Sequence, residues 1–135
     1  MVIKFTELFD IPSATAQQRG HGAHGRTWES PGLKAARAAW QALFERHRPE
    51  KPLEGAITIQ FILWYHRKGL APDAIKPRVV RPDVDNLAKV ILDALMATWI
   101  IRDDAKIFDL HAVKFEHAGP SEVHFIIENW EEPNK

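Results

Sequence analysis

The sequence contains no cysteine, which excludes disulfide bonds and metal sites built on thiolate ligands. It also contains no apolar run that approaches the roughly 20 residues needed to span a bilayer. Residues 1–12 lack the long apolar stretch of a signal peptide. These absences predict a protein that works in the reducing cytoplasm and does not bind membranes.

The sequence has no excess of either charge, because 18 basic residues balance 18 acidic ones. The charges are unevenly distributed: residues 19–89 hold 13 Lys or Arg against 7 Asp or Glu, and residues 90–135 hold 4 against 9. The balanced total argues against a protein that simply coats DNA, whereas the basic middle predicts a polarised surface that attracts phosphate. Chance clustering on an ordinary solvated surface explains the same counts, and charge alone does not decide.

The length and composition are those of one globular domain, which we expect to span residues 1–135. Hydrophobic residues make up 45% of the chain and charged residues 27%, enough for one core and a soluble surface. Turn residues and apolar periodicity predict strands at 2–9, 56–65, 107–115 and 122–128, and helices at 31–46 and 84–97. The order β-α-β-α-β-β predicts an α+β fold of two layers, with two main helices packed on one face of a mixed sheet.

Three segments carry most of this prediction. Ser30 followed by Pro31 is a typical helix start, with the serine as cap. In residues 84–97, apolar side chains recur at helical spacing on one face. Residues 56–65 (AITIQFILWY) read as a strand with apolar side chains on both faces. Such a strand is either central in the sheet or part of a subunit interface.

Two pairs of aspartates flank the helix at 84–97. Asp83 and Asp85 fall in its first turn, where the helix dipole stabilises each carboxylate by about 0.3–1 kcal/mol. A helix cap explains one of them, but two neighbouring carboxylates repel each other, and a divalent cation relieves that repulsion. Asp103 and Asp104 follow the helix, where a polar turn is the simpler explanation. Oxygen-only ligands suit magnesium or manganese better than zinc.

Lys89 lies one helical turn after Asp85. In a purely structural role it forms an i,i+4 ion pair worth a few tenths of a kcal/mol. In a functional role it holds a phosphate or stabilises the charge that develops during cleavage. Asp93 extends the same row by another turn, and we interpret it as a partner of Lys89 and not as a metal ligand.

The segment RPDVDNLAKVILDAL, then an apolar linker, then DDAKIFDLHAVK, resembles the RusA family of Holliday-junction resolvases, the crossover junction endodeoxyribonucleases of bacteria and their prophages. The match covers residues 81–114, and its most specific part is P-D-x-D-N-L-x-K followed by D-D. The resemblance implies a homodimer that binds four-way DNA junctions and cuts two strands symmetrically with Mg²⁺. It implies that Asp83, Asp85 and the pair Asp103–Asp104, chiefly Asp104, are metal ligands, and that Lys89 is a catalytic lysine.

The basic residues before this motif are candidates for DNA binding. Lys76, Arg78 and Arg81 are expected to position the DNA backbone. Family members often carry a basic R-P-R-like segment after the first strand. Here the corresponding stretch is QQRGHGAHGRTW, with Arg19 and Arg26 spread through glycine and histidine. This departure puts the affinity for junctions and the sequence preference in question, but not the metal site.

Three functions fit the sequence to different degrees. The first is a magnesium-dependent, structure-selective endonuclease of recombination and repair, with Mn²⁺ as an alternative cofactor. The second is a non-catalytic junction-binding or architectural protein, which explains the basic middle but not the aspartates. The third is a metal-dependent hydrolase of small phosphate esters. The balanced charge favours it slightly, and the absence of a glycine-rich phosphate loop argues against it.

Overall fold

The computed structural model describes residues 1–15, 19–21 and 27–133. Its contacts divide the chain into two compact units. Unit 1 comprises Met1–Ile11, Leu53–Val80 and Arg102–Lys135, and unit 2 comprises Pro12–Pro52 and Arg81–Ile101. Both boundaries between units in the second half of the chain therefore lie next to an acidic pair.

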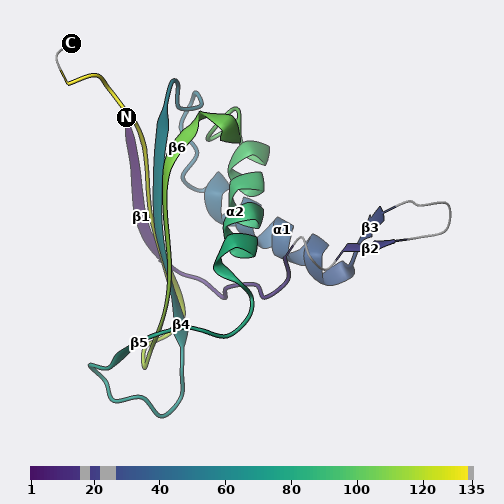
Figure 1. Ribbon diagram of the computed structural model, residues 1–135, viewed down its shortest axis with the longest axis vertical. Coiled ribbons are helices and arrows are strands. Elements are labelled where there is room, and N and C mark those ends of the chain that lie inside the picture. Colours follow the sequence, from purple (N-terminus) through teal and green to yellow (C-terminus); the bar gives the residue numbers. More distant parts are fainter. Residues whose placement is uncertain (16–18, 22–26, 134–135) are drawn as a thin grey trace. The chain divides into compact units, whose positions relative to one another are not determined.

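Unit 1 is built on a five-stranded sheet (Figure 1). Its strands are β1 (Val2–Leu8), β4 (Ile57–His66), β5 (Ile75–Pro77), β6 (Ile107–His117) and β7 (Glu122–Asn129). Their order across the sheet is β1-β7-β4-β6-β5. β4 runs parallel to β6, and the other neighbouring pairs are antiparallel, so the sheet is mixed as predicted.

β4 is central in the sheet, between β7 and β6, which is one of the two positions that its apolar residues predicted. Alternating residues on one side of it are buried: Ile57, Ile59, Phe61, Leu63 and Tyr65. The other side of β4 is less buried, with Ile62 and Trp64 half-buried and Gln60 and His66 exposed, and by register it shares one face of the sheet with residues of β6 and β7. We call this the half-buried face; its apolar members are Ile62, Trp64, Val113, Phe115 and Ile126. The indole of Trp64 stacks on Phe115, with ring centroids 5.1 Å apart.

Unit 2 contains the two helices, α1 (Pro31–Glu45) and α2 (Val84–Ala97), which pack against each other. It also contains a short hairpin, β2 (Arg19–His21) and β3 (Thr27–Glu29). Ser30 caps α1 as predicted, because its hydroxyl oxygen accepts a hydrogen bond of 3.1 Å from the Leu33 amide. No helix within the described residues is both long enough and apolar enough to cross a membrane.

α2 has the bounds that its periodicity predicted, and its end is fixed by local hydrogen bonds. The hydroxyl of Thr98 donates to the carbonyl oxygen of Ala94 at 2.9 Å. Trp99 then adopts a left-handed conformation with φ of 59°, unusual for a bulky side chain. This turn lets the Ile100 amide donate to the Leu95 carbonyl at 3.1 Å, which closes the helix.

The predicted α+β class is confirmed, with a mixed sheet and two main helices, but three short strands were not predicted. β2 and β3 lie between the predicted strand at 2–9 and the predicted helix at 31–46, and β5 lies between the predicted strand at 56–65 and the predicted helix at 84–97. Each has three residues, too few for an alternating apolar pattern. β5 is exposed along its length and occupies the edge of the sheet, where Pro77 needs no ladder hydrogen bond.

Candidate metal and nucleic-acid site

Asp83 and Asp85 stand at the start of α2, where the sequence predicted them. Asp83 is the N-cap residue and has extended backbone angles, φ −67° and ψ 148°. Its carbonyl oxygen accepts from the Leu87 amide at 3.0 Å, but its side chain makes no capping hydrogen bond. Asp85 follows in the first turn, and both side chains are exposed. The helix therefore begins without using either carboxylate.

Lys89 is exposed on the next turn of α2. Among the described residues it forms no ion pair with Asp85 or with Asp93. The ion pair expected between Lys89 and Asp93 is thus not found. An i,i+4 pair on an exposed helix is stabilised by only a few tenths of a kcal/mol, so the spacing permits the pair without enforcing it. The ammonium group stays available for another anion.

The two residues of the second acidic pair, Asp103 and Asp104, differ in their side-chain contacts. Asp103 caps a 3₁₀ helix, η3 (Asp104–Lys106), because its Oδ1 accepts from the Ala105 amide at 3.0 Å. Asp104 is the first residue of η3 and is exposed, and its carboxylate forms no hydrogen bond or ion pair with the described part of the chain. Of the two, Asp104 is the one whose carboxylate is not used by the local fold.

These residues are distributed over both units. Asp83, Asp85 and Lys89 belong to unit 2, whereas Asp103 and Asp104 belong to unit 1. Within either unit, the described residues form no group of three or more His, Asp or Glu side chains that could hold a metal ion. The common site expected for the two acidic pairs therefore stays a prediction.

The basic residues predicted to bind DNA differ in their surroundings. Lys76 on β5 and Arg81 are exposed. Arg78 is only 21% exposed in its side chain, and its Nη1 donates to Oε2 of Glu116 at 3.1 Å. Arg19 lies in the β2–β3 hairpin, and Arg26 lies outside the described residues.

Glu116 on β6 is the principal polar residue that the sequence analysis missed. It is 8% exposed, and its second carboxylate oxygen accepts from Nη1 of Arg67 at 2.8 Å. The Arg78 guanidinium also lies 4.0 Å from the centre of the Tyr65 ring. Burial raises the pKa of Tyr65 to about 12, partly offset by the positive charge of Arg78. An acidic residue on a strand usually faces solvent, and only its place among alternating apolar residues signalled otherwise.

Two comparisons with known proteins bear on this arrangement. The family model described as Endodeoxyribonuclease RusA matches residues 11–128, which covers the sheet from β4 to β7, both helices and both acidic pairs. A search among curated proteins found no match. The family match spans most of the 135 residues and includes the P-D-x-D-N-L-x-K motif at the start of α2. The chain therefore belongs to the RusA family of endodeoxyribonucleases, which resolve Holliday junctions.

Proposed function

We propose that this protein is a magnesium-dependent endonuclease that resolves four-way DNA junctions by paired symmetric cuts, in bacterial or prophage recombination and repair. The observation that carries the proposal is the start of α2. There, two exposed carboxylates of the family motif, Asp83 and Asp85, form no ion pair with the described residues. Carboxylates that serve neither the helix nor an ion pair are available to a cation.

The donor set fits Mg²⁺, with Mn²⁺ as an alternative, because every proposed ligand atom is a carboxylate oxygen. Asp83, Asp85 and Asp104 are the proposed ligands, and Asp103 is an auxiliary one because η3 already uses one of its oxygens. Bound Mg²⁺ supplies Lewis-acid stabilisation of the charge that develops on the phosphate and the leaving 3′ oxygen.

The basic residues have two proposed roles. Lys89, whose ammonium group has no acidic partner among the described residues, holds the scissile phosphate as the catalytic lysine. Lys76 and Arg81, both exposed, contact the DNA backbone. Arg19 and Arg26 extend that contact. Phosphate contacts of this kind fix the position of the DNA without reading its sequence.

A homodimer supplies the two matched cuts. One chain of this size carries one proposed metal site, and two sites related by a two-fold axis match the symmetry of the junction. The half-buried face of the sheet supports the proposal, because Ile62, Trp64 and Ile126 leave part of their apolar surface exposed there. Sedimentation equilibrium at micromolar concentration tests it. A species of about twice 15.4 kDa is expected, and a single species of 15.4 kDa would rule out the dimer.

The proposed activity is tested with three substrates: a synthetic four-way junction, a linear duplex of the same sequence, and nucleotides, each with Mg²⁺ or with EDTA. We expect cleavage of the junction alone, as two symmetric cuts, and only with Mg²⁺. Junction binding without cleavage would instead support a non-catalytic architectural protein. Hydrolysis of nucleotides without junction cleavage would support a small phosphate-ester hydrolase.

A further inference from the structure

The segment from Arg67 to Arg78, which follows β4 and includes β5, is fixed to β6 at both of its ends. At its start, the Arg67 amide donates to the His117 carbonyl at 2.8 Å. The preceding residue, His66, donates from its amide to Oγ of Ser121, beyond the end of β6, at 3.0 Å. At its end, the Arg78 amide donates to the Lys114 carbonyl at 3.0 Å. The backbone thus leaves the sheet and returns to it beside the same strand.

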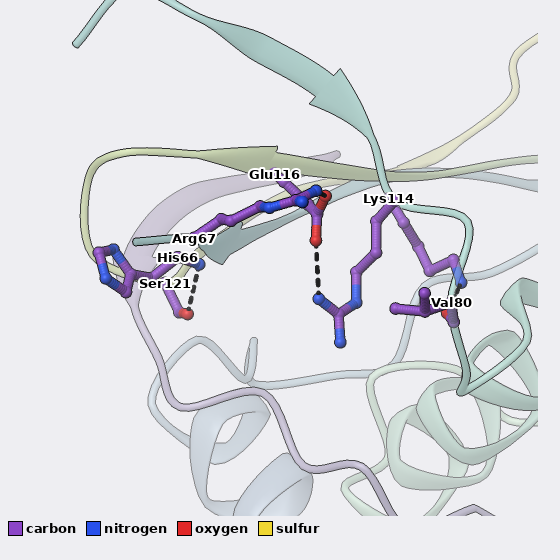
Figure 2. Close-up of polar contacts among 7 residues, drawn as sticks. His66, Arg67, Val80, Lys114, Glu116 and Ser121 are labelled. Atoms are coloured by element: carbon purple, nitrogen blue, oxygen red, sulfur yellow. Dashed lines mark hydrogen bonds and ion pairs between the residues drawn. The ribbon is translucent and has the colours of Figure 1, made fainter. Parts of the chain in front are cut away.

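One carboxylate joins the side chains at these two ends (Figure 2). Glu116 accepts from Arg67 with Oε1 and from Arg78 with Oε2, at 2.8 Å and 3.1 Å. We call this set of three residues the Glu116 clamp. The carboxylate is 10% exposed in its side chain and the Arg78 side chain 21%. A buried ion pair adds little net stability compared with apolar packing, but it fixes the geometry of the groups that it joins.

A further contact beside the clamp holds the last residues of this part of unit 1, which ends at Val80, before the acidic motif. Lys114, two residues before Glu116 on β6, donates from Nζ to the Val80 carbonyl at 2.9 Å (Figure 2). The backbone from Arg78 to Val80 is thereby tied to β6 at the Arg78 amide, the Arg78 guanidinium and the Val80 carbonyl. In the chain, Asp83 follows Val80 after two further residues.

We propose that Arg78 and Glu116 are positioning residues for the nuclease reaction, and that Arg78 acts through Glu116 and not by contact with phosphate. The proposal rests on the proposed function. The guanidinium of Arg78 is already paired with a carboxylate and lies over the Tyr65 ring. Its proposed role is to fix the backbone from Arg78 to Val80, which leads into Asp83. Lys76, which is exposed on β5, keeps the role of a phosphate contact.

The first test separates positioning from phosphate binding with Arg78→Gln and Arg78→Lys, and with Lys76→Gln as the matched control. Junction binding is measured without a divalent cation as a function of salt, and cleavage with Mg²⁺ at saturating protein. Both Arg78 variants should slow cleavage roughly 10- to 100-fold and leave the salt slope unchanged. Lys76→Gln should lower the slope by about one. A lysine keeps the charge but not the planar fork. A direct phosphate contact would therefore be indicated if Arg78→Lys cut at the wild-type rate, or if Arg78→Gln lowered the slope.

The second test asks whether Arg78 acts through Glu116. Arg78→Gln, Glu116→Gln and the double variant form a double-mutant cycle. Because both residues serve the same clamp, the double variant should cleave no more slowly than the slower single variant. Effects that multiply would overturn the proposal, since Arg78 would then act without Glu116.

The third test needs no DNA and no cation. Amide hydrogen exchange of residues 67–80 in the free protein should speed up in Glu116→Gln and Arg78→Gln, and not in Lys76→Gln. Unchanged exchange would show that the clamp does not hold the segment, and would overturn the proposal even if cleavage fell. If the wild-type protein failed to cut junctions, the proposed function would be refuted, whereas faster exchange in the variants would still establish the clamp.

Discussion

The acidic groups of this protein occupy two contrasting environments. At the start of α2, Asp83 and Asp85 are exposed and form no ion pair with the described residues. On β6, Glu116 is 8% exposed and is paired with two arginines. An exposed carboxylate keeps its hydration and can exchange water for a cation, whereas a buried one must be paired to remain charged. The difference separates carboxylates that can bind a ligand from one that maintains the fold.

The largest expected effect is on junction cleavage, and it comes from replacing an exposed carboxylate at the start of α2. Asp85→Asn should lower junction cleavage by at least roughly 100-fold, because it removes a metal ligand while keeping the size of the side chain. DNA binding without Mg²⁺ should be unchanged or tighter, because a negative charge near phosphate is lost. Asp93→Asn, two turns further along α2, is the matched control and should cut normally. Wild-type cleavage by Asp85→Asn would show that the ligands are assigned wrongly.

Replacing the buried carboxylate of Glu116 should lower the stability of the fold more than breaking an exposed ion pair does. Glu116→Gln leaves Arg67 and Arg78 without their carboxylate, and we expect the free energy of unfolding to fall by about 3 kcal/mol. Glu45→Gln is the control, because it breaks the exposed pair of Glu45 with Arg48 at 3.3 Å, worth at most about 0.5 kcal/mol. Denaturant titration of both variants measures the difference. Equal losses would mean that the burial of Glu116 has no energetic consequence.

The smallest expected effect is the pH dependence of stability that comes from Tyr65, which lies beside the clamp. Burial raises its pKa to about 12, from the ordinary tyrosine value of 10.0, and it is the only tyrosine in the sequence, so ultraviolet titration reports it directly. In the unfolded chain the phenol ionises near that ordinary value. Stability from this group is therefore complete below pH 10 and is lost as the pH rises toward 12. Tyr65→Phe should remove that dependence, and Arg78→Gln should raise the pKa of Tyr65 further. A phenol that titrates near pH 10 in the folded protein would contradict its burial.

The sequence predicted the features that depend on periodicity and on local capping. α2 has its predicted bounds because its apolar stripe repeats at helical spacing, and α1 begins at Pro31 because Ser30 can cap it. β5 could not be predicted, since an exposed strand of three residues is defined by its pairing with β6 and not by its own sequence.

The same distinction applies to the candidate site. The motif at Asp83–Lys89 was visible because its residues are neighbours in the chain. The clamp joins Arg67, Arg78 and Glu116, residues that are up to 49 positions apart. Sequence reasoning therefore grouped Arg78 with Lys76 as basic residues that position the DNA backbone. Only the fold shows that Arg78 already has an acidic partner.

Manganese binding to the DNA-free protein tests the central claim most directly, namely that Asp83, Asp85 and Asp104 together hold one divalent cation. Electron paramagnetic resonance counts the bound Mn²⁺, and competition with Mg²⁺ shows whether both use the same site. The account predicts one Mn²⁺ per chain, displaced by Mg²⁺ and lost in Asp85→Asn and Asp104→Asn alike, with Asp93→Asn unaffected. Full binding by Asp104→Asn would contradict it, because the cation would then belong to the start of α2 alone.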